Sequence, residues 1–171
     1  KFKEMLLTCI NLIKQEKLKY TFLMTNLIYQ NPTYLVQCID LFEQAGIKDK
    51  LMICTSYDQV GRFHSQIQKD WWWKNVETVL GKGVTLHTEM ILTQPLIEAV
   101  LEGSLNLSDF LDKGIKISFL NTQGFFNEDA VQTTPKEETM KLLPNFFPKR
   151  ASFLLFLKAK LEYTLYILHL I

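Results

Sequence analysis

The sequence has few cysteines, and their spacing excludes most of the chemistry that cysteine supports. Cys9, Cys38 and Cys54 are the only three in 171 residues, and no two of them form a CxxC or CxxxCxxC pair. The chain therefore carries no recognisable ligand set for zinc or for an iron–sulfur cluster. Each cysteine lies inside an apolar periodic segment, which is typical of a buried and reduced thiol.

An excess of charge of one sign is also missing. Nineteen basic and eighteen acidic side chains give a formal net charge of +1. Strong attraction to a nucleic-acid backbone or to an anionic membrane surface needs a basic excess, which this balance does not indicate. Composition therefore gives no reason to expect nucleic acid as a partner, and it leaves the partner and the oligomeric state unknown.

Neither a secretory signal nor a membrane span is recognisable. The chain opens at Lys1 with helical periodicity and without the charged, apolar and small-residue regions of a signal peptide. The most apolar stretch, 151–171, contains Lys158, Lys160 and Glu162, and a charged residue at the centre of a bilayer costs about 3 kcal/mol. We expect no transmembrane segment, a cytoplasmic location, and a start at Lys1 that is the cut end of a longer protein.

The apolar content is sufficient for one folded domain. Apolar residues make up 47% of the chain and charged residues 22%, which is the usual composition of a globular protein and not of a disordered one. A chain of this length buries roughly two thirds of its unfolded surface. We therefore expect a single domain with its own core.

Helical and strand patterns alternate along the chain. Apolar residues three and four positions apart predict helices, and short apolar or β-branched runs that end in polar turn residues predict strands. The predicted helices cover about 5–19, 33–45, 66–80, 96–101 and 107–111. The predicted strands cover about 20–24, 51–55, 84–92 and 115–120.

This alternation predicts an α/β fold of helices and parallel strands. Parallel strands joined through helices need right-handed crossovers, which leaves an open doubly wound sheet or part of a (β/α) barrel. Residues 122–149 contain Pro135, Pro144 and Pro148 and are expected to be irregular, and the last twenty residues are expected to form a helix. The predicted organisation is an α/β unit over residues 1–121 and a C-terminal helical extension over 122–171 packed on it.

Polar residues follow the predicted strands at the ends where parallel sheets place their sites. They are Thr25 and Asn26, Ser56 with Asp58 and Arg62, Thr93, and Asn121. Their hydroxyl, amide, carboxylate and guanidinium groups suit a ribose, a carboxylate or a phosphate. If the strands are parallel, these residues share one rim. The same residue types are common in turns, so a purely structural role stays open.

Three further features have both a functional and an ordinary structural interpretation. The run Trp71-Trp72-Trp73 resembles a stacking platform, yet successive helical residues face different directions, so one or two of them are expected in the core. His64 has no serine or cysteine nucleophile spaced to it. His87 and Glu89 point to the same side of one predicted strand, where packing is the commoner role.

Several short motifs form a more specific pattern. They are Thr55-Ser56-Tyr57-Asp58-Gln59-Val60-Gly61-Arg62-Phe63, then Trp72-x-x-Asn75-Val76, and a strand ending Ile91-Leu92-Thr93. Together they resemble the later half of radical S-adenosylmethionine enzymes, particularly uncharacterised bacterial and phage members. Thr25-Asn26 is similar to the Thr-Asn pair that ends the third strand of that family's partial barrel, and Phe147-Pro148-Lys149-Arg150 resembles its C-terminal extension.

The resemblance covers roughly residues 20–157 and implies a partial (β/α)6 barrel, of which this chain would supply strands three to six. In that family a CxxxCxxC loop binds a [4Fe–4S] cluster and a Gly-Gly-Glu run binds the methionine amine. The sequence contains neither motif, so the resemblance places both before Lys1 and the cluster ligands outside this chain. The implied chemistry is one-electron cleavage of S-adenosylmethionine to a 5′-deoxyadenosyl radical, with the protein supplying binding and orientation.

The resemblance also implies which residues bind S-adenosylmethionine. Ser56 and Asp58 would face the ribose or the carboxylate, and Arg62 would meet the carboxylate, since its planar guanidinium suits bidentate pairing. The full implied set is Thr25, Asn26, Ser56, Asp58, Arg62, Thr93, Phe119 and Asn121. Of these, Thr93 would reach the ribose and Phe119 to Asn121 would lie against the adenine. The resemblance identifies no substrate residues.

Two other interpretations stay open. A non-catalytic doubly wound α/β module would bind a nucleotide or a protein partner, with residues 56–62 forming only a structured loop. A scaffold docked through the apolar segment 151–171 would bind no small ligand, and strong self-association through that segment would be its sign.

Overall fold

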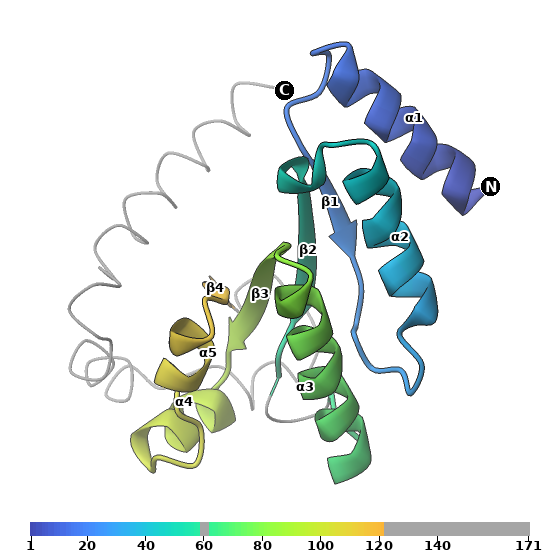
Figure 1. Ribbon diagram of the computed structural model, residues 1–171. Helices are drawn as coiled ribbons and strands as arrows, with labels where there is room; N and C mark the ends of the chain where they lie inside the picture. Colours follow the sequence, from blue (N-terminus) through green and yellow to red (C-terminus); the bar gives the residue numbers. More distant parts are fainter. Residues whose placement is uncertain (59–61, 122–171) are drawn as a thin grey trace, which may run out of the picture.

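The computed structural model describes residues 1–58 and 62–121 (Figure 1). Helices and strands alternate along them, as the sequence patterns predict. The helical elements are α1 (Phe2–Lys14), α2 (Thr33–Gln44), the 3-10 helix η1 (Lys48–Lys50), α3 (Gln66–Gly81), α4 (Gln94–Leu101) and α5 (Ser108–Asp112). The strands are β1 (Thr21–Met24), β2 (Leu51–Ser56), β3 (Thr85–Leu92) and β4 (Lys116–Asn121). The predicted extension, 122–171, lies outside the described residues.

The four strands form one parallel sheet in the order β1-β2-β3-β4. Each strand therefore lies beside the strand that follows it in the chain. The predicted α/β fold of alternating helices and parallel strands is confirmed. A doubly wound sheet reverses its strand order at a switch point, and the strands in the described part of the chain contain no such reversal.

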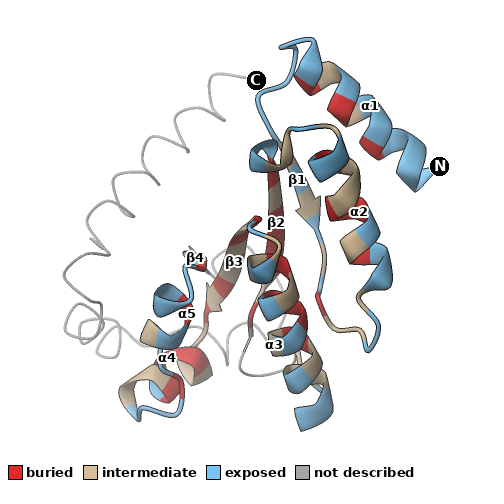
Figure 2. Ribbon diagram, in the orientation of Figure 1, coloured by how far each residue is buried: buried red, intermediate tan, exposed pale blue. Residues whose placement is uncertain are grey.

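The helices pack on one side of this sheet (Figures 1 and 2). Alternate residues of β3 are buried, among them Leu86, Thr88 and Met90. On β2 the corresponding positions include Ile53 and Thr55, which are also buried. We call this side of the sheet the helix-covered face. Successive side chains of a strand point to opposite sides, so the intervening residues form a second side that no described helix covers, the helix-free face.

An aromatic cluster joins α3, α5 and the end of β2 on the helix-covered face. Trp72 is fully buried, and its ring lies 5.2 Å from that of Tyr57 and 6.0 Å from that of Phe110. Its Nε1 donates a hydrogen bond to Thr55 Oγ1 at 3.3 Å. Trp71 and Trp73 are only partly buried. Trp72 therefore meets the expectation that one or two of the three tryptophans belong to the core. The three rings do not form a common stacking platform.

The first helix is shorter than predicted, because α1 ends at Lys14 and not near residue 19. Its buried stripe stops at Ile13. Glu16 then adopts a left-handed conformation with φ 56°, and the N–H of Lys17 bonds back to the carbonyl of Leu12 at 2.9 Å. This hydrogen bond satisfies a carbonyl group at the end of the helix, and the left-handed residue turns the chain towards β1.

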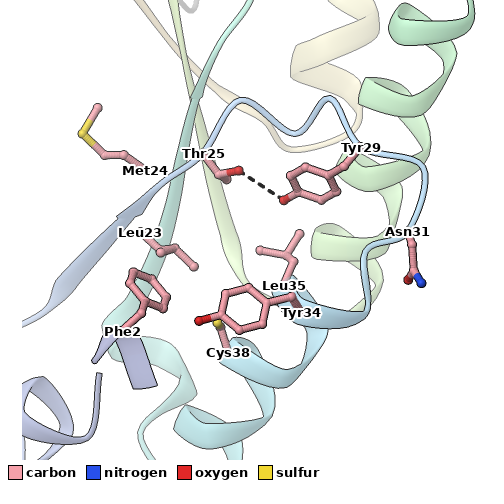
Figure 3. A pocket seen from close by; sticks show the side chains of 9 residues that line it. All are labelled: Phe2, Leu23, Met24, Thr25, Tyr29, Asn31, Tyr34, Leu35 and Cys38. Carbon is pink, nitrogen blue, oxygen red and sulfur yellow. Dashed lines mark hydrogen bonds between the residues drawn. The ribbon is translucent and has the colours of Figure 1, made fainter. Parts of the chain in front are cut away.

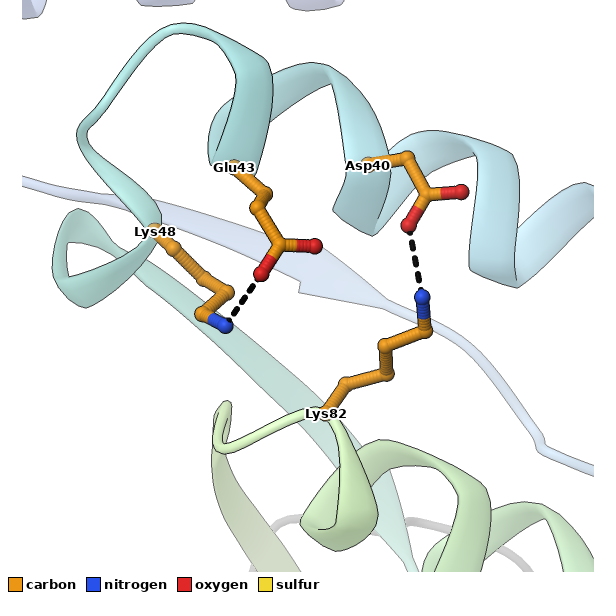
Figure 4. A network of polar contacts seen from close by, with 4 residues as sticks. All are labelled: Asp40, Glu43, Lys48 and Lys82. Carbon is orange, nitrogen blue, oxygen red and sulfur yellow. Dashed lines mark hydrogen bonds and ion pairs between the residues drawn. The ribbon is translucent and has the colours of Figure 1, made fainter.

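Two ion pairs connect elements at the end of the sheet where β2 and β3 begin (Figure 4). Lys82 in the turn before β3 lies 2.8 Å from Asp40 of α2, and Lys48 of η1 lies 2.6 Å from Glu43 of α2. The hydrogen bond that Lys82 donates to the Asp40 carboxylate raises the pKa of Lys82. Both pairs hold α2 in place at the edge opposite to the predicted site. None of the helices in residues 1–58 and 62–121 has the length and hydropathy to span a membrane.

Candidate functional site

The carboxyl ends of the four strands lie along one edge of the sheet, where most of the predicted site residues stand. Ser56 and Asn121 are the last residues of β2 and β4. Thr25 and Thr93 directly follow β1 and β3. Because all strand pairs are parallel, these four positions share one rim. The structure thus brings together the strand-end residues that the sequence suggested.

Thr25 and Asn26 use their side chains within their own loop. The Oγ1 of Thr25 lies 3.1 Å from the hydroxyl of Tyr29 and accepts a hydrogen bond from the N–H of Leu27 at 3.3 Å. The Oδ1 of Asn26 accepts a hydrogen bond from the N–H of Ile28 at 3.0 Å. Such bonds over two residues are typical of turns. The structural role that the sequence left open is therefore observed for both residues.

Thr93 has a comparable local role. It is the N-cap of α4, and its Oγ1 accepts a hydrogen bond from the N–H of Leu96 at 3.3 Å. Pro95 in the first turn supports the same helix start. Phe119 lies within β4 opposite Met90 and packs against the core. Its ring therefore belongs to the helix-covered face and not to the rim.

The other predicted rim residues are Ser56, at the end of β2, and Asp58 and Arg62, in the loop that follows it. Ser56 is half-buried and points to the helix-free face. Arg62 is partly buried, and this burial lowers the pKa of its guanidinium while the charge of Asp58 opposes the change. The Nε of Arg62 is buried and has no hydrogen-bond partner among the described residues. A buried donor of this kind is costly unless a ligand or water accepts from it.

The helix-free face carries a polar cluster whose assembly the sequence alone does not reveal. Strand register places Cys54 beside His87 and His87 beside Lys116, and in the next row Ser56 beside Glu89 and Glu89 beside Ser118. The His87 Nε2 and the Ser118 Oγ are 2.6 Å apart, a hydrogen bond between β3 and β4. We call this set the helix-free cluster: Cys54, Ser56, His87, Glu89, Lys116 and Ser118.

The charge of Glu89 acts on the thiol of Cys54. Burial raises the pKa of the Cys54 thiol, and the charge of Glu89 raises it further. The thiol is therefore protonated at neutral pH and is not an activated nucleophile. None of the side-chain ion pairs within the described residues involves Glu89. In the same part of the chain no group of three His, Cys, Asp or Glu residues is arranged to hold a metal ion.

A separate cavity of about 250 Å³ lies beside the edge strand β1, between α1 and α2 (Figure 3). Apolar and aromatic side chains such as Phe2, Leu23 and Tyr34 line most of it. The hydroxyl groups of Thr25 and Tyr29 meet at its wall, and burial raises the pKa of Tyr29. Met24, which points to the helix-free face, also borders the cavity, but none of the six residues of the helix-free cluster lines it.

Part of the pattern that forms the helix-free cluster is visible in the sequence. His87 and Glu89 alternate along β3, and Lys116 and Ser118 alternate along β4. Which residue of one strand lies beside which of the next depends on register, and register is visible only in the structure. His64, by contrast, is exposed, and only its backbone N–H bonds to the side chain of Gln68.

Comparison with known proteins gives no relative: no family model, no curated protein and no solved structure matches the chain significantly.

Proposed function

We propose that this chain supplies the later strands of a radical S-adenosylmethionine enzyme's partial (β/α)6 barrel and contributes residues at its strand ends to cofactor binding. The observation that carries this proposal is the arrangement of the sheet. Four parallel strands follow one another in sequential order, with the described helices on one face and the helix-free cluster on the other. A barrel needs this arrangement, because its helices form the outer layer and its strand ends carry the site.

The strand order favours the barrel over a doubly wound module. A doubly wound sheet carries helices on both faces and binds its ligand where the strand order reverses. Within the described residues β1 to β4 run in order, and the aromatic rings of α3 and α5 meet on one side of the sheet. The fold therefore supports the same family that the short sequence motifs resemble.

The rim residues fit S-adenosylmethionine as a ligand. The unpartnered Nε of Arg62 suits a carboxylate, and the hydroxyl of Ser56 and the carboxylate of Asp58 suit ribose hydroxyl groups. Thr25, Asn26 and Thr93 would shape the loops around the ligand, since their side chains already bond within those loops. Asn121 completes the rim by its position at the end of β4.

The [4Fe–4S] cluster does not fit the residues of this chain. Cys38 and Cys54 are buried on different elements and Cys9 lies on α1, so the cluster ligands belong to polypeptide outside the chain. Cluster and cofactor together would supply one-electron cleavage of S-adenosylmethionine. The part of this chain is to bind the cofactor's polar groups at the rim and to present the helix-free face to the substrate.

The reading frame upstream of the Lys1 codon tests this proposal. We expect it to encode two further βα units that contain CxxxCxxC and, after the next strand, Gly-Gly-Glu. A start codon directly before Lys1, or an upstream frame that lacks both motifs, would overturn the proposal. A cluster-free α/β binding module would then be the better description.

A further inference from the structure

On the helix-free face, Glu89 has no ion-pair partner among the residues that the structure describes, and short polar side chains lie beside it. Glu89 is half-buried in the middle of the sheet, flanked by Ser56 on β2 and by Ser118 on β4. The carboxylates that do form ion pairs in the described chain all belong to a helix or to η1. Lys116 lies beside His87 in the strand register, and no side-chain ion pair within the described residues joins it to Glu89. A half-buried carboxylate without an ion-pair partner can accept charge-assisted hydrogen bonds from a cationic ligand.

Hydroxyl and imidazole groups lie beside this carboxylate. The bond between His87 and Ser118 fixes both side chains on the helix-free face, at 2.6 Å. The hydroxyl of Ser56 lies on the other side of Glu89. Serine hydroxyls and imidazole nitrogens can each donate or accept, so they suit ligand hydroxyl groups, which do the same.

Apolar side chains border the polar cluster. Phe22 and Met24 of β1 are 50% and 72% exposed on the same face, and Leu120 of β4 is 43% exposed. Apolar walls around a few convergent polar groups are the usual construction of a small-molecule site. A sheet face that simply met water would carry more long charged side chains, whereas Glu89 and Lys116 are the only such residues in the helix-free cluster.

We propose that the helix-free face binds a small substrate that carries a protonated amine next to hydroxyl groups, with Glu89 as the partner of the amine. Ser56, Ser118 and His87 are the partners of the hydroxyl groups. This inference rests on the proposed function, because it names the substrate class for the inner face of the same barrel. On this proposal, Glu89 is the residue that selects a positively charged amine over a neutral ligand of similar shape.

An NMR titration of the full 171-residue chain tests the inference. The probe is glucamine, a primary amine on a polyhydroxyl chain, and its neutral counterpart is N-acetylglucamine. We expect glucamine to bind with a Kd of about 1 mM and to shift backbone amides around Ser56, Glu89 and Ser118. N-Acetylglucamine should bind about tenfold more weakly, since it lacks the charge that Glu89 pairs with.

Variants assign the effect to Glu89. E89Q should remove the tenfold difference between the two probes, whereas E102Q, which neutralises an exposed carboxylate after α4, should keep it. S118A should weaken both probes equally, because it removes a hydroxyl and no charge; this variant serves as the test if E89Q does not fold. Equal binding of both probes to the wild-type chain, shifts confined to other elements, or unchanged discrimination in E89Q would each overturn the inference.

The test separates this inference from the proposed function. It needs neither S-adenosylmethionine nor a cluster, so a failure to bind glucamine leaves the barrel assignment standing. The converse result is also distinguishable. If Glu89 discriminates between the two probes but the upstream frame lacks both motifs, only the assignment to a radical enzyme is overturned.

Discussion

Asn75 in the middle of α3 fixes the backbone of Leu27, donating a hydrogen bond from its Nδ2 to the Leu27 carbonyl at 2.8 Å. The same nitrogen donates to the carbonyl of Tyr29 at 2.7 Å. Asn75 is fully buried, so the loop that carries Thr25 and Asn26 is tied to a helix almost fifty residues further along the chain. This contact explains the asparagine of the Trp72-x-x-Asn75-Val76 motif as a residue that positions the rim.

Replacing Asn75 should destabilise the protein strongly. N75A leaves the buried carbonyl of Leu27 and the partly buried carbonyl of Tyr29 without this donor and opens a small cavity, so we expect the free energy of unfolding to fall by about 2–4 kcal/mol. Denaturant titration followed by circular dichroism measures the change. The exposed neighbour Lys74 on the same helix provides the control, since K74A should change stability by no more than about 0.5 kcal/mol. Similar values for the two variants would contradict the role assigned to Asn75.

Replacing either of two buried threonines by valine should change the stability of the protein differently. T55V removes the acceptor of the Trp72 indole N–H, and a buried unpaired donor costs about 1–3 kcal/mol. Thr88 is also buried, but its hydroxyl has no hydrogen-bond partner within the described residues. T88V should therefore leave stability unchanged or raise it by about 1 kcal/mol. Thermal unfolding of the two variants side by side checks the contrast, and a larger loss in T88V than in T55V would refute it.

The three thiols should differ in reactivity. Cys9 is partly exposed on α1, whereas Cys38 and Cys54 are buried and burial raises the pKa of both thiols. A chromogenic disulfide reagent should label one thiol per chain quickly and the other two only on unfolding. C9S should abolish the fast phase. A fast phase that persists in C9S would contradict the burial of Cys38 or of Cys54.

Stability should decline in strong base because of Tyr57. Burial raises the pKa of Tyr57 to about 12 in the folded protein, against about 10 in an unfolded chain. Between these two values the unfolded state has lost the proton that the folded state keeps, so the free energy of unfolding falls as the pH rises. We expect a loss of about 2 kcal/mol between pH 10 and 12 from this group. Tyr29, whose pKa burial also raises, adds to it in the same direction.

Urea titrations across that pH range measure the effect. Y57F removes the ionisable group, so its stability should fall less steeply over the same interval. An equally steep fall in Y57F would assign the pH dependence to other groups.

The elements of the fold could be read from the sequence because their boundaries are local. Gly46 and Gly114 follow helices with φ values of 73° and 79°, and Thr93 begins α4 as a cap. These are signals that single residues provide. The predicted end of α1, near residue 19, is too late. Glu16 adopts a left-handed backbone conformation, and glutamate is not a residue type that signals such a turn in the sequence.

The candidate site was only partly predictable, because it depends on relations between strands. Ser56 and Thr93 could be placed on one rim from the parallel order alone. The neighbours Cys54, His87 and Lys116 could not be grouped, since register decides which residues lie side by side. Whether Thr25 bonds to its own loop or to a ligand likewise depends on the fold of that loop.

The most direct test of the proposed function is release of 5′-deoxyadenosine from S-adenosylmethionine by the product of the complete gene, reconstituted with iron and sulfide without oxygen. We predict release by the wild-type protein. R62Q should raise the KM for S-adenosylmethionine at least about tenfold, whereas K14Q, which removes an exposed positive charge at the end of α1, should leave it unchanged. No release of 5′-deoxyadenosine, or the same KM in R62Q and K14Q, would contradict the assignment of this rim to the cofactor.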